Sequence, residues 1–551
     1  MHLNTGLSLA SVLVLPAVAA CTNTTSPTSC DVSTLSNLVP TLESSLRSNA
    51  TVLSAVHVNT NGSFGDPVSD SGLPPWYSTG LPDLCAVEVN VTSSENSSYI
   101  FWLFLPSAWN SKFMAVGNAA AGGFINFLDM GAGTHYGFAT LSTNTGHTAS
   151  IGDVSWAYGE PEKWEDFGWR SMHGSVELGK DLVAAYYKQS IKYSYYTGCS
   201  TGGRQGLKEA QVQFDSFDGM LIGAPAWWSS HFVSWATKIS KDFYTDEYPT
   251  GIIPTDLFPT LAATIVEQCD ALDGVEDGII SAADLCKPDL SVLACNATTN
   301  SSSCFTPLQI EMLGEIYSNY TVNSTFVYPG LEPSSELGWS TSLFGGIPNP
   351  SGLDFMRAML SDPDWALEDY DDSVLEYVTA NDPGNSSADD YDMSSYRDRG
   401  GKILMYHGLA DPLIPTGGSV YFYEQVAAAT GISHPITDWF RLFFVPGMLH
   451  CTGTPVGAPW MLNGIDQTPS LSSSAYSIPG FEDARHDAIL ALMDWVENGN
   501  AVDEIIATNY NDLTDFSKGV SIQRPLCPYP QRAVYDGIGD VDESDSWSCK
   551  S

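Results

Sequence analysis

Short apolar runs rich in β-branched and aromatic residues alternate with helical patterns along most of the chain. The runs that we expect to be strands are Tyr99–Pro106, Lys112–Gly117, Gly137–Thr143, Tyr193–Thr197, Gly219–Ile222, Lys402–His407 and Trp439–Val445. Apolar residues recur at helical spacing in Trp169–Gln189, Arg204–Val212 and Ala484–Val496. Because parallel strands need crossovers that cover the sheet, this alternation predicts an α/β fold with a mostly parallel sheet.

The alternation stops near Trp227 and resumes at Lys402. Between these points the chain is richer in Cys, Asn, Ser, Pro and acidic residues, and its apolar runs are short. We therefore expect a core formed by residues 21–226 and 397–551, with residues 227–396 inserted as a lid.

The first 20 residues have the pattern of a secretory signal peptide. An apolar run from Leu7 to Leu15 precedes Pro16 and the A-x-A site Ala17-Val18-Ala19, although no Lys or Arg precedes the run. The run is too short to span a bilayer, and no other apolar stretch in the sequence is long enough. A secreted, N-glycosylated protein is therefore expected, with some of these sequons occupied: Asn23, Asn49, Asn61, Asn90, Asn96, Asn296, Asn300, Asn319, Asn323 and Asn385.

The charge balance narrows the possible partners. A formal charge of −42 with only 22 basic residues argues against nucleic-acid binding. The sequence has no zinc-protease, P-loop or dinucleotide motif, so no organic cofactor is expected. We expect His147, His173 and His407 to be core or supporting residues rather than metal ligands, and we expect no membrane or obligate protein partner.

Eleven cysteines fit an oxidising compartment and leave at least one cysteine unpaired. Local spacing suggests three pairs: Cys269–Cys286, Cys295–Cys304 and Cys527–Cys549. Cys30 and Cys85 are also expected to form disulfides. Cys21 would follow the removed signal peptide and is the expected odd cysteine.

The segment Gly198-Cys199-Ser200-Thr201-Gly202 lies between an expected strand and an expected helix. In this context Gly-x-Ser-x-Gly forms a sharp turn that exposes the serine at a helix N-terminus, where free backbone N–H groups can bind an oxyanion. The alternative is a glycine-rich connection without chemistry.

A nucleophilic serine needs a base and an acid that orients the base. Asp411 follows the expected strand Lys402–His407, and three histidines come after it. His434 precedes a strand and His486 lies on a helix, whereas His450 directly follows a strand. His450 is therefore the best candidate for the base.

Two cysteines stand beside the candidate nucleophile and base. Cys199 precedes Ser200, and Cys451 follows His450. A Cys199–Cys451 disulfide would hold the two functional residues close together. The alternative, Cys199 as a catalytic thiolate, would need a free thiol in an oxidising compartment, so we favour Ser200 as the nucleophile.

This arrangement resembles the fungal tannase and feruloyl esterase family of secreted serine esterases over almost the whole mature chain. The matching segments are TNTGH at 143–147, GCSTGGRQG at 198–206, FDGMLIGAPA at 217–226, the acidic loop at 269–280, HGLAD at 407–411 and GMLHC at 447–451. The resemblance implies an α/β-hydrolase fold with a large inserted lid.

The resemblance also implies roles for individual residues. Ser200 would be the nucleophile, Asp411 the orienting acid and His450 the general base, and the N–H of Thr201 would be the first oxyanion donor. The loop at Gly117–Gly123 should supply the second donor, but it has less glycine after Gly-Asn than the family has, so this donor stays unassigned.

Residues 269–280 place carboxylates at short, odd spacings with two glycines. Such a loop can wrap a hard cation, or it can be a solvated acidic turn. The resemblance implies a structural Ca²⁺ that serves lid folding, with ligands from Asp270, Asp273 and Asp277 and from the carbonyls of Val275 and Ile279.

The expected activity is hydrolysis of phenolic-acid esters. The segments CSTGGRQG and TNTGH look closer to the feruloyl esterases of type B, so the expected substrates are hydroxycinnamoyl esters of plant cell-wall polysaccharide or small esters of the same acids. The alternatives are a tannase acting on galloyl esters and a non-catalytic glycan-binding protein on a hydrolase scaffold.

Overall fold

The computed structural model describes residues 28–66, 77–296, 303–431, 435–467 and 476–551. The expected signal peptide, Cys21, Asn23, Asn300 and His434 lie outside the described residues. Within the described part of the chain, no helix has the length and apolar character needed to cross a membrane.

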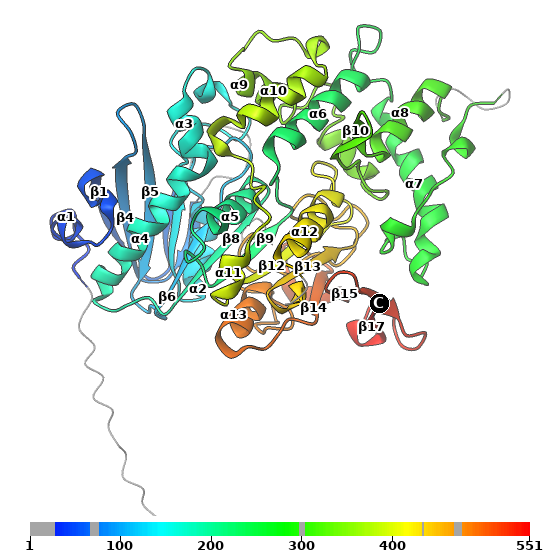
Figure 1. Cartoon of the computed structure of the whole chain (residues 1–551). Coiled ribbons are helices and arrows are strands. Elements are labelled where there is room, and N and C mark those ends of the chain that lie inside the picture. The colour runs from blue at the N-terminus through cyan, green and yellow to red at the C-terminus, as the bar shows by residue number, and fades with distance from the viewer. Residues whose placement is uncertain (1–27, 67–76, 297–302, 432–434, 468–475) are drawn as a thin grey trace, which may run out of the picture.

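A nine-stranded mixed sheet forms the centre of the molecule (Figure 1). In spatial order its strands are β1 (Ala50–Val58), β4 (Leu84–Thr92), β5 (Ser98–Pro106), β7 (Ala139–Thr143), β6 (Lys112–Val116), β8 (Tyr193–Cys199), β9 (Gly219–Gly223), β12 (Lys402–Gly408) and β13 (Phe440–Val445). The strands from β7 to β13 are parallel, whereas β1, β4, β5 and β7 pair antiparallel. The seven expected strands are all present, and β1 and β4 add an antiparallel edge that was not expected.

Helices cover both faces of the sheet and bury separate apolar clusters. One face carries α1 (Val32–Leu38), α4 (Ser171–Tyr187), α5 (Thr201–Val212) and α12 (Gly417–Thr430). The other face carries α2 (Phe127–His135) and α13 (Ala488–Asn498). Smaller elements complete this part: β2 (Gly62–Gly65), β3 (Tyr77–Leu81), α3 (Pro161–Glu165), β14 (Ile505–Tyr510), β15 (Val520–Leu526), β16 (Arg532–Tyr535) and β17 (Trp547–Lys550).

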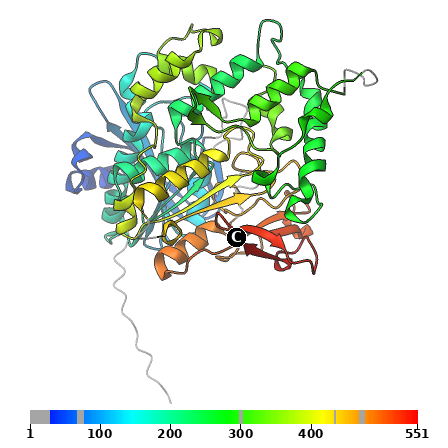
Figure 2. The ribbon, with the colours of Figure 1, turned by 45° about the vertical axis from the view of Figure 1, so that its right-hand side comes forward.

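The chain between β9 and β12, residues 224–401, is called the insert below. Its described residues add no strand to the nine-stranded sheet. They form α6 (Ser229–Phe243), α7 (Phe258–Cys269), α8 (Pro307–Tyr317), the hairpin β10 (Tyr320–Val322) and β11 (Thr325–Tyr328), α9 (Leu353–Leu360), α10 (Asp372–Asn381) and α11 (Ser394–Asp398). In Figures 1 and 2 most of the insert, in green, lies above the sheet, and the C-terminal hairpins, in red, lie below it.

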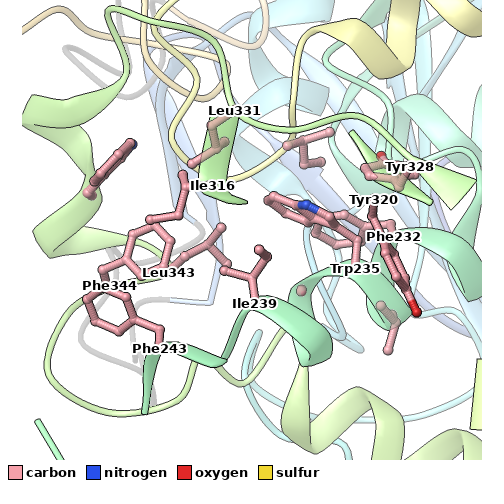
Figure 3. Close-up of a cluster of buried hydrophobic side chains, with 14 of the residues drawn as sticks. Phe232, Trp235, Ile239, Phe243, Ile316, Tyr320, Tyr328, Leu331, Leu343 and Phe344 are labelled. Atoms are coloured by element: carbon pink, nitrogen blue, oxygen red, sulfur yellow. The ribbon is translucent and has the colours of Figure 1, made fainter. Parts of the chain in front are cut away.

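The insert has its own apolar core, built around one face of α6. Figure 3 shows Phe232 and Trp235 beside Tyr320 and Tyr328, with Ile239, Phe243, Ile316, Leu331, Leu343 and Phe344 continuing the cluster. Phe243 and Phe344 have ring centroids 4.5 Å apart. Burying these large rings removes enough apolar surface from water to hold the insert together although its helices are short.

Five disulfides link the cysteines of the described residues, three of them across short stretches of chain and two across longer ones. They are Cys30–Cys85, Cys199–Cys451, Cys269–Cys286, Cys295–Cys304 and Cys527–Cys549. The three pairs suggested by local spacing and the Cys199–Cys451 pair are all present. Cys199–Cys451 is the longest-range link, because it joins the end of β8 to the loop after β13 across 252 positions.

Glycines let the turn between β8 and α5 pack against the loop after β6. A Cβ atom on Gly202 would lie 2.9 Å from the carbonyl oxygen of Asn118 and 3.2 Å from the Cα of Gly117. A Cβ on Gly198 would lie 2.9 Å from the carbonyl carbon of Gly202. A residue larger than glycine at either position would therefore force the backbone to shift.

Replacing Gly202 with alanine tests this packing. We expect Gly202→Ala to lower the free energy of unfolding by about 1–3 kcal/mol, because the added methyl group meets rigid backbone. Gly314→Ala is the matched control: it lies inside α8 with open space around its Cβ position, and it should raise stability by about 0.5–1 kcal/mol. Urea unfolding measures both changes, and equal effects would contradict the close approach.

Candidate active site

Ser200 occupies the turn between β8 and α5 in a conformation that few non-glycine residues adopt. Its φ is 64° and its ψ is −124°. Two backbone hydrogen bonds hold it there: its N–H donates to Gly223 O at 3.0 Å, and Ala226 N–H donates to Ser200 O at 3.1 Å. The strain is thus imposed by the neighbouring strand β9, as is usual where a side chain must be presented for chemistry.

Asp411 lies just beyond the end of β12 and is fully buried. Its Oδ1 accepts hydrogen bonds from the backbone N–H groups of Leu413 and Ile414, each at 2.9 Å. Its Oδ2 lies 2.7 Å from His450 Nδ1. A proton on Nδ1 leaves Nε2 of His450 as the basic nitrogen, which is the tautomer that a general base requires.

His407 also contacts Asp411, in line with the expected supporting role. Its Nε2 lies 3.1 Å from Asp411 Oδ2 and 3.0 Å from Ile414 O, and its Nδ1 lies 2.8 Å from Ser419 Oγ. Two acceptors at Nε2 require the proton to be there. Burial alone would raise the pKa of Asp411, but His450 and His407 together hold it below its usual value, so the carboxylate stays ionised.

The Cys199–Cys451 disulfide places His450 next to the Ser200 turn. The Cα atoms of the two cysteines are 6.2 Å apart, and each cysteine directly adjoins one of the functional residues. His486, by contrast, pairs with Asp483 at 2.8 Å on another part of the molecule. Of the described histidines after Asp411, His450 is therefore the one that the structure brings to this site.

A pocket opens beside Ser200 and Thr201 between the core and the insert. Its lining is mostly apolar: Ala120, Trp164, Phe167, Ala226, Phe232, Val233, Phe355, Met359, Leu413 and Ile414, with Ser229, Ser351, Ser386 and Arg204 as the polar members. Arg204 is fully buried and donates to the carbonyls of Phe167 at 3.1 Å, Gly168 at 2.7 Å and Ser386 at 2.9 Å. It ties α5, which begins at the serine turn, to both walls of the pocket.

The loop after β6 faces the pocket through Ala120. Five of its backbone N–H groups already have protein acceptors, namely those of Gly117, Asn118, Ala121, Gly122 and Gly123. His147 holds the loop in place, because its Nε2 lies 2.9 Å from Ala121 O and its ring stacks on Trp156. Burial lowers the pKa of His147 to about 4, so the imidazole is neutral at ordinary pH.

A short helix of the insert, η9 (Glu336–Thr341), braces the loop that carries Asp411. Ser334 Oγ donates to Leu409 O at 3.0 Å, and Ser342 Oγ donates to Pro412 O at 2.9 Å. Gly338 packs directly against Pro412. No sequence motif marked these residues, although they hold the backbone on both sides of the candidate acid.

The expected cation loop offers a partial fit to a metal ion. Asp270 Oδ1 and Asp273 Oδ2 are buried and have no hydrogen-bond partner, as free ligand atoms would be. Both oxygens of Asp277 are engaged, with Ile279 N–H at 3.0 Å and Arg524 at 2.8 Å. Among the described residues, no group of three or more His, Cys, Asp or Glu side chains is arranged to hold a metal.

In the α/β-hydrolase class of enzymes, the nucleophile turn follows one parallel strand, and the acid and the base follow later strands of the same sheet. Ser200 after β8, Asp411 after β12 and His450 after β13 have this arrangement. Known proteins agree with this class. The family model described as tannase and feruloyl esterase matches residues 85–550. A probable feruloyl esterase B-1 from Aspergillus oryzae is 34% identical over 508 residues, which are 91% of this chain and 90% of that protein.

Solved structures show the same likeness. The crystal structure of feruloyl esterase B from Aspergillus oryzae has a TM-score of 0.84 at 30% identity, and the match covers 94% of this chain and 99% of that one. Tannin acyl hydrolase from Aspergillus niger shares the fold, with a TM-score of 0.69 at 21% identity over 95% of this chain and 96% of that one. The chain belongs to the tannase and feruloyl esterase family, and it is a carboxylic ester hydrolase with an α/β-hydrolase fold.

Glu336 at the start of η9 makes the brace sensitive to pH. Its carboxyl is fully buried and accepts from Tyr317 OH at 2.7 Å, and burial raises its pKa from 4.5 to about 7. Between these two values the folded chain keeps a proton that the unfolded chain has lost. The contribution of Glu336 to the free energy of unfolding should therefore fall by about 3 kcal/mol as the pH rises from 4.5 to 7.

Glu336→Gln should flatten this fall, since the amide stays neutral at every pH. The exposed Glu311→Gln on α8 serves as the control and should leave the profile unchanged. Urea unfolding across this pH range measures the difference, and parallel profiles for the wild type and Glu336→Gln would contradict the assignment.

Proposed function

We propose that the chain is a serine esterase that hydrolyses hydroxycinnamoyl esters, with Ser200 as nucleophile, His450 as general base and Asp411 as the acid that orients it. The observation that carries the proposal is the 2.7 Å bond between His450 and buried Asp411, tied to the Ser200 turn by the Cys199–Cys451 disulfide. Asp411 remains ionised beside the imidazole, as stabilisation of an imidazolium requires.

The reaction would proceed through an acyl-enzyme. Ser200 Oγ attacks the ester carbonyl while His450 Nε2 takes its proton, and the imidazolium then protonates the leaving alcohol. In the second step His450 takes a proton from a water, which attacks the acyl carbonyl. The acyl–Oγ bond then breaks, the acid leaves, and the imidazolium returns its proton to Ser200 Oγ.

The negative charge on the tetrahedral intermediate needs backbone donors. Thr201 N–H, at the start of α5, is the first proposed donor. Ala120 N–H is the second, because Ala120 lines the pocket while the N–H groups of five neighbouring loop residues are already bonded.

The lining of the pocket favours a phenylpropenoyl group over a galloyl group. Trp164, Phe167, Phe232 and Phe355 offer apolar and aromatic surface to a substituted ring. A galloyl ring carries three adjacent hydroxyls, and a site that selects it must supply a matching set of polar partners. Of the polar lining residues, Arg204 is already bonded to three carbonyls, and Ser229 Oγ donates to Ser386 O at 3.3 Å. The relatives named feruloyl esterase B point to the same substrate class.

Secretion, glycosylation and a calcium ion belong to the same proposal. Five disulfides suit a chain that folds in an oxidising compartment and acts on esters of plant cell-wall polysaccharide. A structural Ca²⁺ would be held by Asp270 and Asp273 with the carbonyls of Val275 and Ile279, and Asp277 would be shared with Arg524. The ion would stabilise the acidic loop and take no part in the reaction.

The proposal is tested by kcat/KM on methyl ferulate, caffeate, p-coumarate, sinapate and gallate. We expect the hydroxycinnamates to exceed gallate, and Ser200→Ala to lose at least about three orders of magnitude on the best substrate. A fluorophosphonate should label the wild type once, on Ser200.

Each contradicting result has a distinct meaning. Preference for gallate would indicate a tannase. Residual activity in Ser200→Ala above that level would remove Ser200 as nucleophile. Absence of labelling together with absence of hydrolysis would indicate a non-catalytic protein on this scaffold.

A further inference from the structure

A second hollow, with a volume of about 710 Å³, separates the insert from helix α12. This volume lies within the range of about 300–1,000 Å³ that is common for ligand sites. The insert supplies one wall, from residues 283–290, the end of α8 and residues 326–333. The other wall is α12, through Gly417, Val420, Tyr421 and Glu424. We call this hollow the α12 groove.

The groove has the mixed chemistry that suits a sugar. Phe326 of β11 stacks on Tyr421 of α12 with ring centroids 4.7 Å apart, so an aromatic surface crosses from one wall to the other. Glu332, Asp284 and Glu424 add carboxyl groups along the same hollow. Sugar rings present apolar C–H faces between hydroxyls, so they pack on aromatic rings while their hydroxyls bond to carboxyl and carbonyl oxygens.

Asn319 lies on the lining of the groove and begins an N-x-T sequon. Asn319 directly precedes β10 and Thr321 lies within it; both are exposed, so the acceptor is open to glycosylation. The next sequon, at Asn323, is also exposed but lies at the tip of the β10–β11 hairpin and does not line the groove.

We propose that Asn319 carries an N-linked glycan whose first sugars lie in the α12 groove and bridge the insert to the core. The occupant is thus the chain's own glycan, covalently attached at the rim. This inference rests on the proposed secretion of the chain and does not depend on the identity of the ester substrate.

The glycan would act as a restraint between the two parts of the molecule. The groove face of α12 consists of Gly417, Val420, Tyr421 and Glu424, whose spacing of three, one and three residues forms one stripe of the helix. Because attachment makes the contact intramolecular, weak sugar contacts suffice to hold the insert against α12.

The test uses the full chain secreted from a eukaryotic host, in three forms: the wild type, Thr321→Ala and Asn323→Gln. Thr321→Ala destroys the Asn319 sequon but keeps Asn319 itself. Asn323→Gln removes only the glycan at Asn323. Glycopeptide mass spectrometry should find Asn319 occupied. Endoglycosidase treatment of the native wild type should release the Asn319 glycan severalfold more slowly than the Asn323 glycan.

Hydrogen exchange then reports on α12. We expect severalfold faster exchange in residues 417–424 and a lower Tm in Thr321→Ala, and no change in either quantity in Asn323→Gln.

An empty Asn319 in a chain glycosylated elsewhere would overturn the inference alone, whereas a chain with no glycan would overturn secretion as well. Equal exchange in all three forms would show an occupied site whose glycan lies in solvent, and would also overturn it. Protection of 417–424 by added soluble oligosaccharide in Thr321→Ala, with Asn319 empty in the wild type, would assign the groove to a free sugar instead.

Discussion

The Cys199–Cys451 disulfide is the constraint on which the arrangement of the site depends. In the sheet, β8 and β13 are separated by β9 and β12, and three strand spacings amount to about 14 Å. Parallel register therefore brings the ends of both strands to one edge but leaves them apart. The disulfide closes that gap to 6.2 Å between Cα atoms and brings the His450 loop back over β9 and β12 toward Ser200. Asp411, at the end of β12, lies on this return path.

The buried strands could be predicted because both of their faces are apolar. Runs such as KILMYH and YIFWLFLP are recognised as strands because most of their residues are buried against helices or other parts of the core. β1 escaped prediction because much of it is exposed, and β4 because polar residues such as Glu88 and Asn90 interrupt its apolar positions. An edge strand such as β1 carries a weak signal, since only part of its surface is selected for burial.

The site residues also fall into those that the sequence could predict and those that it could not. Ser200, Asp411 and His450 follow strand ends in short motifs, so their positions could be predicted from local sequence. The pocket wall could not, because Phe232 lies on α6 whereas Phe355 and Met359 lie on α9, and the two helices meet only through the tertiary packing of the insert. The hydrogen bonds from Ser334 and Ser342 to the Asp411 loop could not be predicted either, since the sequence does not distinguish a serine that bonds a distant carbonyl from any other serine.

The most direct measurement of this account is kcat/KM on methyl ferulate for the double variant Cys199→Ser with Cys451→Ser, at a temperature where the variant is folded. The control is Cys527→Ser with Cys549→Ser, which opens the disulfide of the C-terminal hairpin. A misplaced base costs about a hundredfold in rate, so the first variant should lose that much while the control keeps its activity. Equal kcat/KM in both variants would contradict the claim that the Cys199–Cys451 bond sets the Ser200–His450 geometry.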